Sequence, residues 1–484
     1  MRDIASSRGE YIVTKVEDLS VAIIGAGPIG LAAAAHLIAR QIPVRLYEAG
    51  DSVAANVRDW GHVRLFSPWR FNIDEMAKSI LFDHGWREPP ADVLPTGREL
   101  YEAYLRPFAA TPEIAAITET GATVESISRL GIDKVVSRDR AKRPFILTIR
   151  TAAGLRMDRA RAVIDASGTW RNPNPLGASG LRAPGETELN DEIRYGTPDV
   201  LGRHRATYEG RRVLVIGGGH SAANVVLDLA QLPAQKAITR IIWAVRSQSL
   251  ARVFGGGDAD KLPARGKLGS DLKRLVEVDG LTIVTGFSAE RVERTAAGIV
   301  VTGDMQSDAR PLHPVDRVIV STGQRPDLDM TRELRLDLDA WLESPRLLAP
   351  MIDPNVHSCG TVPPHGYREL AHAEPDFFTV GIKSYGRAPT FLMAAGYEQV
   401  RSVTAFLAGD RAAADNVRLV LPETGVCSAP YDVAEKAGAG CCGGPAAESV
   451  DACCVADAEA KAEGEAGCGC SSAANSLPAS VASV

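Results

Sequence analysis

Cysteine is nearly absent from most of this 484-residue chain. Only Cys359 lies before Cys427, where the other seven of the eight cysteines begin. A body with one cysteine cannot be held together by internal disulfides, which excludes a small secreted disulfide scaffold. We therefore expect a core that is stabilised by apolar burial, and a location in the reducing cytoplasm.

An excess of positive charge and a long uninterrupted apolar run are missing as well. The net charge of −6 belongs to the segment from Cys427 onward, which has eight acidic and two basic residues. A neutral body gives no electrostatic reason to bind nucleic acid or an anionic membrane. The longest apolar run, residues 21–39, contains three glycines and a proline. We expect neither a membrane span nor a secretory signal, and nothing indicates an oligomeric state.

What the sequence does contain is an internal repeat. The stretch VAIIGAGPIGLAAAAHL, beginning at Val21, is matched by VLVIGGGHSAANVVLDL, beginning at Val213. Each copy has the pattern of a buried strand, a glycine turn and an alanine-rich helix, which opens a doubly wound α/β domain. The predicted fold class is therefore α/β, with two Rossmann-like dinucleotide-binding domains.

The first turn has the glycine spacing of a dinucleotide site. Gly25, Gly27 and Gly30 form G-x-G-x-x-G, and Ala26 and Pro28 stand between them. The first glycine permits a tight turn, the second lets the backbone approach a diphosphate, and the third lets the helix pack on the strand.

The second turn has the variant spacing G-x-G-x-x-A. The residues of this predicted nucleotide site are Gly217, Gly218, Gly219, His220, Ser221 and Ala222. Thr322 and Gly323 follow a later strand that closes the second domain, and we expect them to border the same nucleotide.

The residues at the next strand end predict which nucleotide each turn binds. Glu48 ends the strand after the first turn, where a carboxylate can accept hydrogen bonds from both ribose hydroxyls. Arg246 stands at the corresponding place after the second turn, and positive charge there suits the 2′-phosphate of NADPH. The two turns are therefore predicted to bind different nucleotides.

Changes in composition divide the chain into six segments. The tail beyond Cys427 has almost no large apolar residues. It cannot recover its ordering entropy by burial, so we predict that it is disordered without a ligand. The predicted segments are an N-terminal extension 1–18, the first domain 19–175, a linker 176–207, the second domain 208–330, the returning part of the first domain 331–426, and the tail 427–484.

With the second domain inserted into the first, this arrangement resembles the flavoprotein pyridine-nucleotide oxidoreductases, above all the flavin-containing monooxygenases. The resemblance spans residues 19–421 and implies FAD at the first turn and NADPH at the second. The stretches KSYGRAPTFLMAAGYEQVRS and LPETGVCS, with the cysteine-paired tail, are similar to flavin monooxygenase-like proteins of bacterial arsenic-resistance clusters. That similarity implies a cytoplasmic enzyme that uses molecular oxygen and a small molecule such as a trivalent arsenical.

Three functions remain open on these grounds. In the first, which we favour, NADPH reduces the flavin and oxygen then oxygenates a soft nucleophile. The second is reduction of a bound acceptor, or oxidase activity, without oxygen insertion. The third is a thiol-armed metal-binding protein whose flavin domain is not catalytic.

Two motifs are absent, and their absence argues against oxygen insertion into ketones and against a redox-active dithiol beside the flavin. The aromatic-G-x-x-x-H-x-x-x-W pattern of Baeyer–Villiger enzymes does not occur before the second domain. Neither C-x-x-C nor C-x4-C occurs before Cys359, which argues against a thioredoxin-reductase-type dithiol.

By the same resemblance, two stretches should line the flavin. In WGHVRLFSPWRFNID, Trp60 and Trp69 would wall the flavin ring and Asn72 would hold a polar contact to it. Ordinary packing and a turn would explain these three residues equally well.

The second stretch is GIKSYGRAPT. Lys383 and Arg387 are predicted to contact the cofactor, and Tyr385 is predicted to act in catalysis. The alternative for all three is an ordinary solvated loop.

Cys359 stands between His357 and His365. A thiol flanked by imidazoles can be a reactive thiolate or a soft-metal ligand. A small buried residue is the favoured alternative.

The remaining thiols lie in close pairs in the tail. Adjacent residues have Cα atoms ~3.8 Å apart, below the usual disulfide range of ~4.4–6.8 Å. No histidine follows His372, so an all-thiolate ligand set would favour soft ions such as trivalent arsenic, Hg(II) or Cu(I). The predicted metalloid ligands are Cys441, Cys442, Cys453, Cys454, Cys468 and Cys470.

Overall fold

The computed structural model describes residues 15–233, 238–250, 254, 263–276, 281–305, 308–354, 362–419 and 421. Two units are distinguished, residues 1–430 and 431–484, and every described residue belongs to the first. The predicted tail with its cysteines, and Cys359 with His357, lie outside the described residues.

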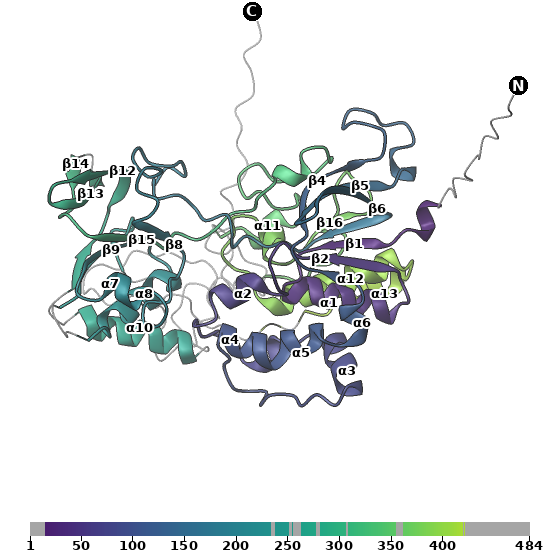
Figure 1. Ribbon diagram of the computed structural model, residues 1–484, viewed down its shortest axis with the longest axis horizontal. Coiled ribbons are helices and arrows are strands. Elements are labelled where there is room, and N and C mark those ends of the chain that lie inside the picture. The colour runs from purple at the N-terminus through teal and green to yellow at the C-terminus, as the bar shows by residue number, and fades with distance from the viewer. Residues whose placement is uncertain are drawn as a thin grey trace, which may run out of the picture. The chain divides into compact units, whose positions relative to one another are not determined.

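The first sheet has five parallel strands in the order β16-β7-β1-β2-β3. Of these strands, β16, β1 and β2 are labelled in Figure 1. Their bounds are β1 Val21–Ile24, β2 Val44–Tyr47, β3 Thr118–Glu119, β7 Ala162–Asp165 and β16 Phe377–Thr379. Every residue of β1 and β7 is buried, because helices or other strands cover both faces of the sheet. Since β16 follows the second repeat in the sequence, the second domain is inserted into the first, as predicted.

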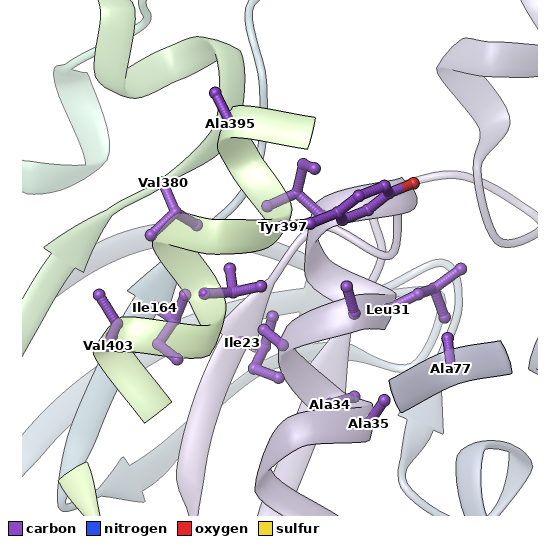
Figure 2. Packing of buried hydrophobic residues seen from close by; sticks show 14 of the residues in the cluster. Ile23, Leu31, Ala34, Ala35, Ala77, Ile164, Val380, Ala395, Tyr397 and Val403 are labelled. Atoms are coloured by element: carbon purple, nitrogen blue, oxygen red, sulfur yellow. The ribbon is translucent and has the colours of Figure 1, made fainter. Parts of the chain in front are cut away.

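Helix α1 (Pro28–Ala39) packs against α12 (Met393–Leu407) beside this sheet. The four alanines of residues 32–35 are fully buried, so the α1 backbone can approach its neighbours closely. Figure 2 shows Leu31 of α1 in one cluster with Ile23, Ile164 and Val403.

Shorter helices surround this core. The α-helices are α2 Ala55–Asp59, α3 Glu75–Asp83, α4 Gly97–Leu100, α5 Arg106–Ala109, α6 Pro112–Ala115, α11 Ala349–Ile352 and α13 Arg411–Asp415. The 3-10 and π turns are η1 Val16–Asp18, η2 Trp69–Phe71, η3 Tyr101–Leu105, η4 Arg140–Lys142, η6 Asp329–Thr331 and η7 Gly381–Tyr385.

The second sheet also has five parallel strands, in the order β11-β10-β9-β15-β8. Its strands are β8 Ile193–Tyr195, β9 Arg212–Ile216, β10 Arg240–Ala244, β11 Leu281–Val284 and β15 Arg317–Val320. Its helices are α7 Arg205–Tyr208, α8 His220–Ala230 and α10 Pro263–Val276. A separate antiparallel sheet of this domain consists of β12 Ser288–Thr295, β13 Gly298–Met305 and β14 Asp308–Pro311.

The segment predicted as a linker, residues 176–207, takes part in this second domain. Its strand β8 pairs with β15, and Leu189 and Ile193 are buried in the same core as Val318. Within the described part of the chain, no helix has the length and apolar character that crossing a membrane requires.

A buried Arg–Glu–Arg cluster ties a third sheet to the C-terminal segment. This sheet is antiparallel, with β4 Thr123–Arg129, β5 Phe145–Thr151 and β6 Gly154–Ala160. The fully buried Glu374 accepts hydrogen bonds from Arg129 Nε at 2.8 Å and from Arg140 Nη2 at 2.7 Å. Burial acts to raise the pKa of Glu374, but these hydrogen bonds outweigh it and the pKa lies below its ordinary value.

We predict that Glu374→Gln lowers the free energy of unfolding by about 3 kcal/mol at neutral pH, because two buried guanidinium groups lose their carboxylate. The folded-state pKa lies below the unfolded-state value of ~4.3, so the charge stabilises the protein above that value. Its contribution disappears as the pH falls through the folded-state pKa. Urea denaturation at several pH values should show the difference from the unsubstituted protein shrinking in acid.

The matched control is Glu333→Gln, which neutralises an exposed carboxylate near the same cluster. It should change the free energy of unfolding by less than ~0.5 kcal/mol. A difference for Glu374→Gln that does not vary with pH would contradict the assigned charge state.

Candidate functional site

The turn between β1 and α1 requires glycine at two positions. Gly25 has a φ of +95°, and a Cβ there would lie 2.7 Å from the carbonyl oxygen of Ala166. A Cβ on Gly30 would lie 1.8 Å from the carbonyl oxygen of Gly25. Helix α1 can therefore rest on the turn only if position 30 has no side chain. This agrees with the roles that the spacing predicts for the first and third glycines.

Gly27, unlike Gly25 and Gly30, borders open space and not neighbouring backbone. Its φ of −76° suits any residue, and a Cβ there would meet no protein atom within 4 Å. Gly27 is also the N-cap of α1, which has no side-chain cap and begins at Pro28. Open space beside an uncapped helix N-terminus favours an anion, so this turn fits the diphosphate of a dinucleotide.

Glu48 lies directly after β2 and faces the same turn. Its two carboxylate oxygens accept hydrogen bonds from the backbone N–H groups of Ala26 and Gly50, both at 2.8 Å. Each oxygen keeps a second lone pair, so a contact with ribose hydroxyls remains compatible with the geometry. The role of Glu48 in shaping the turn was not predicted from the sequence.

A buried ion pair holds the neighbouring loop. Lys383 Nζ lies 2.7 Å from Asp165 Oδ2, and both side chains are at most 2% exposed. This contact is an ion pair without hydrogen-bond alignment, whereas Lys383 Nζ donates a hydrogen bond to Ser167 Oγ at 3.1 Å. Ser167 Oγ in turn donates to Asp165 Oδ1 at 2.6 Å. The predicted cofactor contact of Lys383 stays a prediction, and its partner Asp165 was missed.

Tyr385 lies in a buried neutral network. Its ring meets Phe391 edge to face at 5.2 Å, and its hydroxyl lies 3.5 Å from His365 Nε2. Gln399 Nε2 donates to His365 Nε2 at 3.0 Å, which leaves the His365 Nδ1–H to donate to the Pro363 carbonyl. Burial lowers the pKa of His365 and raises the pKa of Tyr385, so both groups are neutral near pH 7.

Arg387 lies near this network but points to another partner. Its Nε and Nη2 atoms each donate to a Glu343 carboxylate oxygen at 2.9 Å. This bidentate contact raises the pKa of Arg387. The guanidinium thus already has an anionic partner in Glu343. The predicted cofactor contact of Arg387 stays a prediction.

The residues predicted to line the flavin occupy well-packed positions. The ring of Trp60 lies so close to Gly97 that a Cβ there would be 2.5 Å from it, and Trp69 is buried. Asn72 is fully buried, and its amide donates to the carbonyl oxygens of Ser67 and Pro68 at 2.7 and 3.1 Å. The turn role considered for Asn72 is thus visible, while the flavin contacts of all three remain predictions.

The second turn repeats the plan of the first. Gly217 has a φ of +141°, and a Cβ there would lie 2.2 Å from the carbonyl oxygen of Ser321. Gly219 is the N-cap of α8, has no side-chain cap, and offers open space within 4 Å of a Cβ. Ala222 is buried, and the His220 ring meets Phe66 edge to face at 5.3 Å. This turn therefore fits a second diphosphate.

The other residues predicted to border the second nucleotide lie at the same edge of the second sheet as this turn, because the parallel strands β10, β9 and β15 end there. Arg246 follows β10, is exposed, and donates through Nη1 to the Ala178 carbonyl at 3.3 Å. Thr322 and Gly323 follow β15, and Asn174 donates to their two carbonyl oxygens at 2.9 and 3.0 Å. The remaining members of the predicted site, Gly218 and Ser221, are exposed.

In the described ranges between residues 15 and 421, no group of three His, Cys, Asp or Glu side chains could hold a metal ion. The predicted metalloid ligands are all in the tail, outside those ranges.

Comparison with known sequences matches residues 22–349 to the family described as pyridine nucleotide-disulphide oxidoreductases. The indole-3-pyruvate monooxygenase YUCCA1 of Oryza sativa subsp. japonica is 29% identical over 214 residues. The aligned region is 43% of this chain and 44% of that protein, so the match spans less than half the length of this relative.

Two solved structures share the fold. The bacillithiol disulfide reductase of Bacillus cereus has a TM-score of 0.59 at 18% identity, covering 81% of this chain and 99% of that chain. A flavin monooxygenase variant from Stenotrophomonas maltophilia has a TM-score of 0.51 at 21% identity, covering 80% and 99%. The predicted α/β fold with two nucleotide-binding domains is thereby confirmed, and FAD and NADPH agree with this family.

We predict that Gly27→Ala separates cofactor binding from folding. The added methyl group meets no protein atom, so the Tm of the flavin-free protein should stay within about 2 °C. The methyl group would occupy the space of the diphosphate, so FAD affinity should fall at least about tenfold. Titration of the flavin-free protein with FAD measures the affinity, and a melting curve of the same flavin-free protein measures the Tm.

Gly30→Ala is the contrasting variant, because its Cβ would meet backbone at 1.8 Å and should lower the Tm itself. Unchanged FAD affinity in Gly27→Ala would place the diphosphate elsewhere.

Proposed function

Because the chain belongs to the pyridine nucleotide-disulphide oxidoreductase family and is therefore an oxidoreductase, we propose that it is an FAD- and NADPH-dependent monooxygenase. The supporting observation is the pair of open glycine turns, each at the carboxyl edge of its own parallel sheet. A carboxylate, Glu48, borders the first turn, and an exposed arginine, Arg246, borders the second. The first combination suits FAD and the second suits NADPH.

The sequence favours oxygen insertion over disulfide reduction. A thioredoxin-reductase-type enzyme uses a C-x-x-C or C-x4-C dithiol beside the flavin, and neither spacing occurs before Cys359. The partial relative YUCCA1 is named as a monooxygenase, which supports the same class. Bound FAD would supply two-electron exchange with NADPH and with oxygen. In the net reaction, NADPH, a proton, oxygen and substrate give NADP⁺, water and the oxygenated substrate.

The residues of this chain would bind and orient the two cofactors. The N–H groups at the start of α1 and of α8 would each face a diphosphate. The buried Asp165–Lys383 pair would keep the loop after β7 against the first turn. The neutral network of His365, Gln399 and Tyr385 would keep water out from beneath the η7 loop.

For the substrate we propose a soft nucleophile, with a trivalent arsenical as the leading candidate. The support comes from the tail, where the cysteines stand in close pairs and no histidine is available. Thiolates prefer soft ions. Thiols tethered to the enzyme would raise the local concentration of a captured arsenical.

The test is NADPH oxidation by the FAD-loaded protein in air, with and without methylarsonous acid, with hydrogen peroxide followed in parallel. We expect the arsenical to stimulate NADPH use severalfold, with little peroxide and with a pentavalent product. Gly219→Ala is the control, because it should weaken NADPH binding without loss of flavin. Unstimulated turnover that releases stoichiometric peroxide would rule out this function.

The role of the tail is tested separately. We predict that replacing the seven cysteines from Cys427 onward with serine raises the KM for the arsenical and leaves kcat unchanged. Delivery by a tethered arm affects capture and not the reaction itself. The number of arsenite ions bound per protein, measured after gel filtration, should fall in parallel. An unchanged KM and an unchanged stoichiometry would exclude a delivery arm.

A further inference from the structure

The buried indole of Trp243 contacts the second glycine turn from the neighbouring strand β10. Trp243 lies on β10 and is fully buried, and its Nε1–H donates to the carbonyl oxygen of Gly217 at 2.8 Å. This carbonyl belongs to the peptide that joins Gly217 to Gly218. Trp243 is among the largest fully buried side chains of the described chain.

The direction of that carbonyl determines the direction of the next N–H group. The described chain has no cis peptide bonds, so the C=O of Gly217 and the N–H of Gly218 point in opposite directions. Because the carbonyl is held against the buried indole, the N–H of Gly218 points away from the core. Gly218 is exposed, and within the described residues its N–H has no acceptor.

Among the residues that the structure describes, no side chain donates to the corresponding carbonyl of the first turn. Tyr47 and Ala244 occupy equivalent places, since their carbonyl oxygens accept from the N–H groups of Gly25 and Gly217. The residue before Tyr47 is Leu46, whose side chain has no hydrogen-bond donor, whereas the residue before Ala244 is Trp243, whose indole N–H is a donor. In the first turn, helix α1 itself covers the carbonyl of Gly25 through the bare Cα of Gly30. In the second turn, Ala222 has a side chain and the indole supplies the contact.

We propose that Trp243 is a positioning residue for NADPH, which aims the Gly218 N–H at the diphosphate. This inference rests on the proposed binding of NADPH at the second turn. Trp243 acts through the backbone and does not itself touch the nucleotide. The indole therefore affects every ligand that has a diphosphate at this turn, independently of the 2′-phosphate.

The test compares two ligands on full-length, FAD-loaded protein by isothermal titration calorimetry. NADP⁺ contains the diphosphate, whereas adenosine 2′-monophosphate contains only the adenosine and the 2′-phosphate. In Trp243→Phe, the Kd for NADP⁺ should rise about tenfold, the factor that corresponds to ~1.4 kcal/mol for one buried hydrogen bond. The Kd for adenosine 2′-monophosphate should not change.

Two further variants separate positioning from a general loss of packing. Ile241→Ala removes volume from the same face of β10, one pleat further from the turn, and should change neither Kd. Arg246→Ala should weaken both ligands, because it removes the proposed partner of the 2′-phosphate.

Three results would overturn the inference. These are an unchanged Kd for NADP⁺ in Trp243→Phe, an equal loss for both ligands in that variant, and the same loss in Ile241→Ala. Failure of the unsubstituted protein to bind NADP⁺ is a different result, because it would remove the proposed function and this inference together.

Discussion

The approach of bare glycine to neighbouring backbone, at the ends of β1 and β9, is the contact on which the other features depend. A Cβ at Gly25 would lie 2.7 Å from Ala166, and a Cβ at Gly217 would lie 2.2 Å from Ser321. Any side chain would push the loop after β7 or β15 away from its turn. Those strands flank β1 and β9, so the sheets and the open space at each helix N-terminus require the same two positions to be glycine.

Insertion of the second domain creates a problem of register for the first, because its two parts are far apart in the sequence. Apolar contact between α1 and α12 holds the parts together but tolerates small shifts. Buried charges do not, since each is stable only beside its partner. The pairs Asp165–Lys383 and Arg129–Glu374 both join the two parts, and they restrict the returning segment to one position.

Both turns could be predicted from the sequence because their steric demands are local: a left-handed glycine and an uncapped helix start are visible in a few residues. The Asp165–Lys383 pair could not be predicted, because its members are joined only by the folded chain. Strand β8 escaped prediction because the surrounding residues 176–207 are rich in proline and glycine. The hydrogen bond from the Asn72 amide to Ser67 agrees with the alternative of ordinary packing and a turn, but the bond itself was not predicted.

The two turns differ in a way that would suit one cofactor that stays bound and another that exchanges in each reaction cycle. Glu48 is 9% exposed and already bonded to backbone, so a ribose there would meet a rigid, preformed group. Arg246 is exposed and, among the described residues, donates to the carbonyl of Ala178, so a 2′-phosphate there would meet a solvated cation. Buried, preorganised contacts slow dissociation, whereas exposed charges mainly assist association and are screened by salt. This division would suit a retained flavin at the first turn and an exchanging nicotinamide nucleotide at the second.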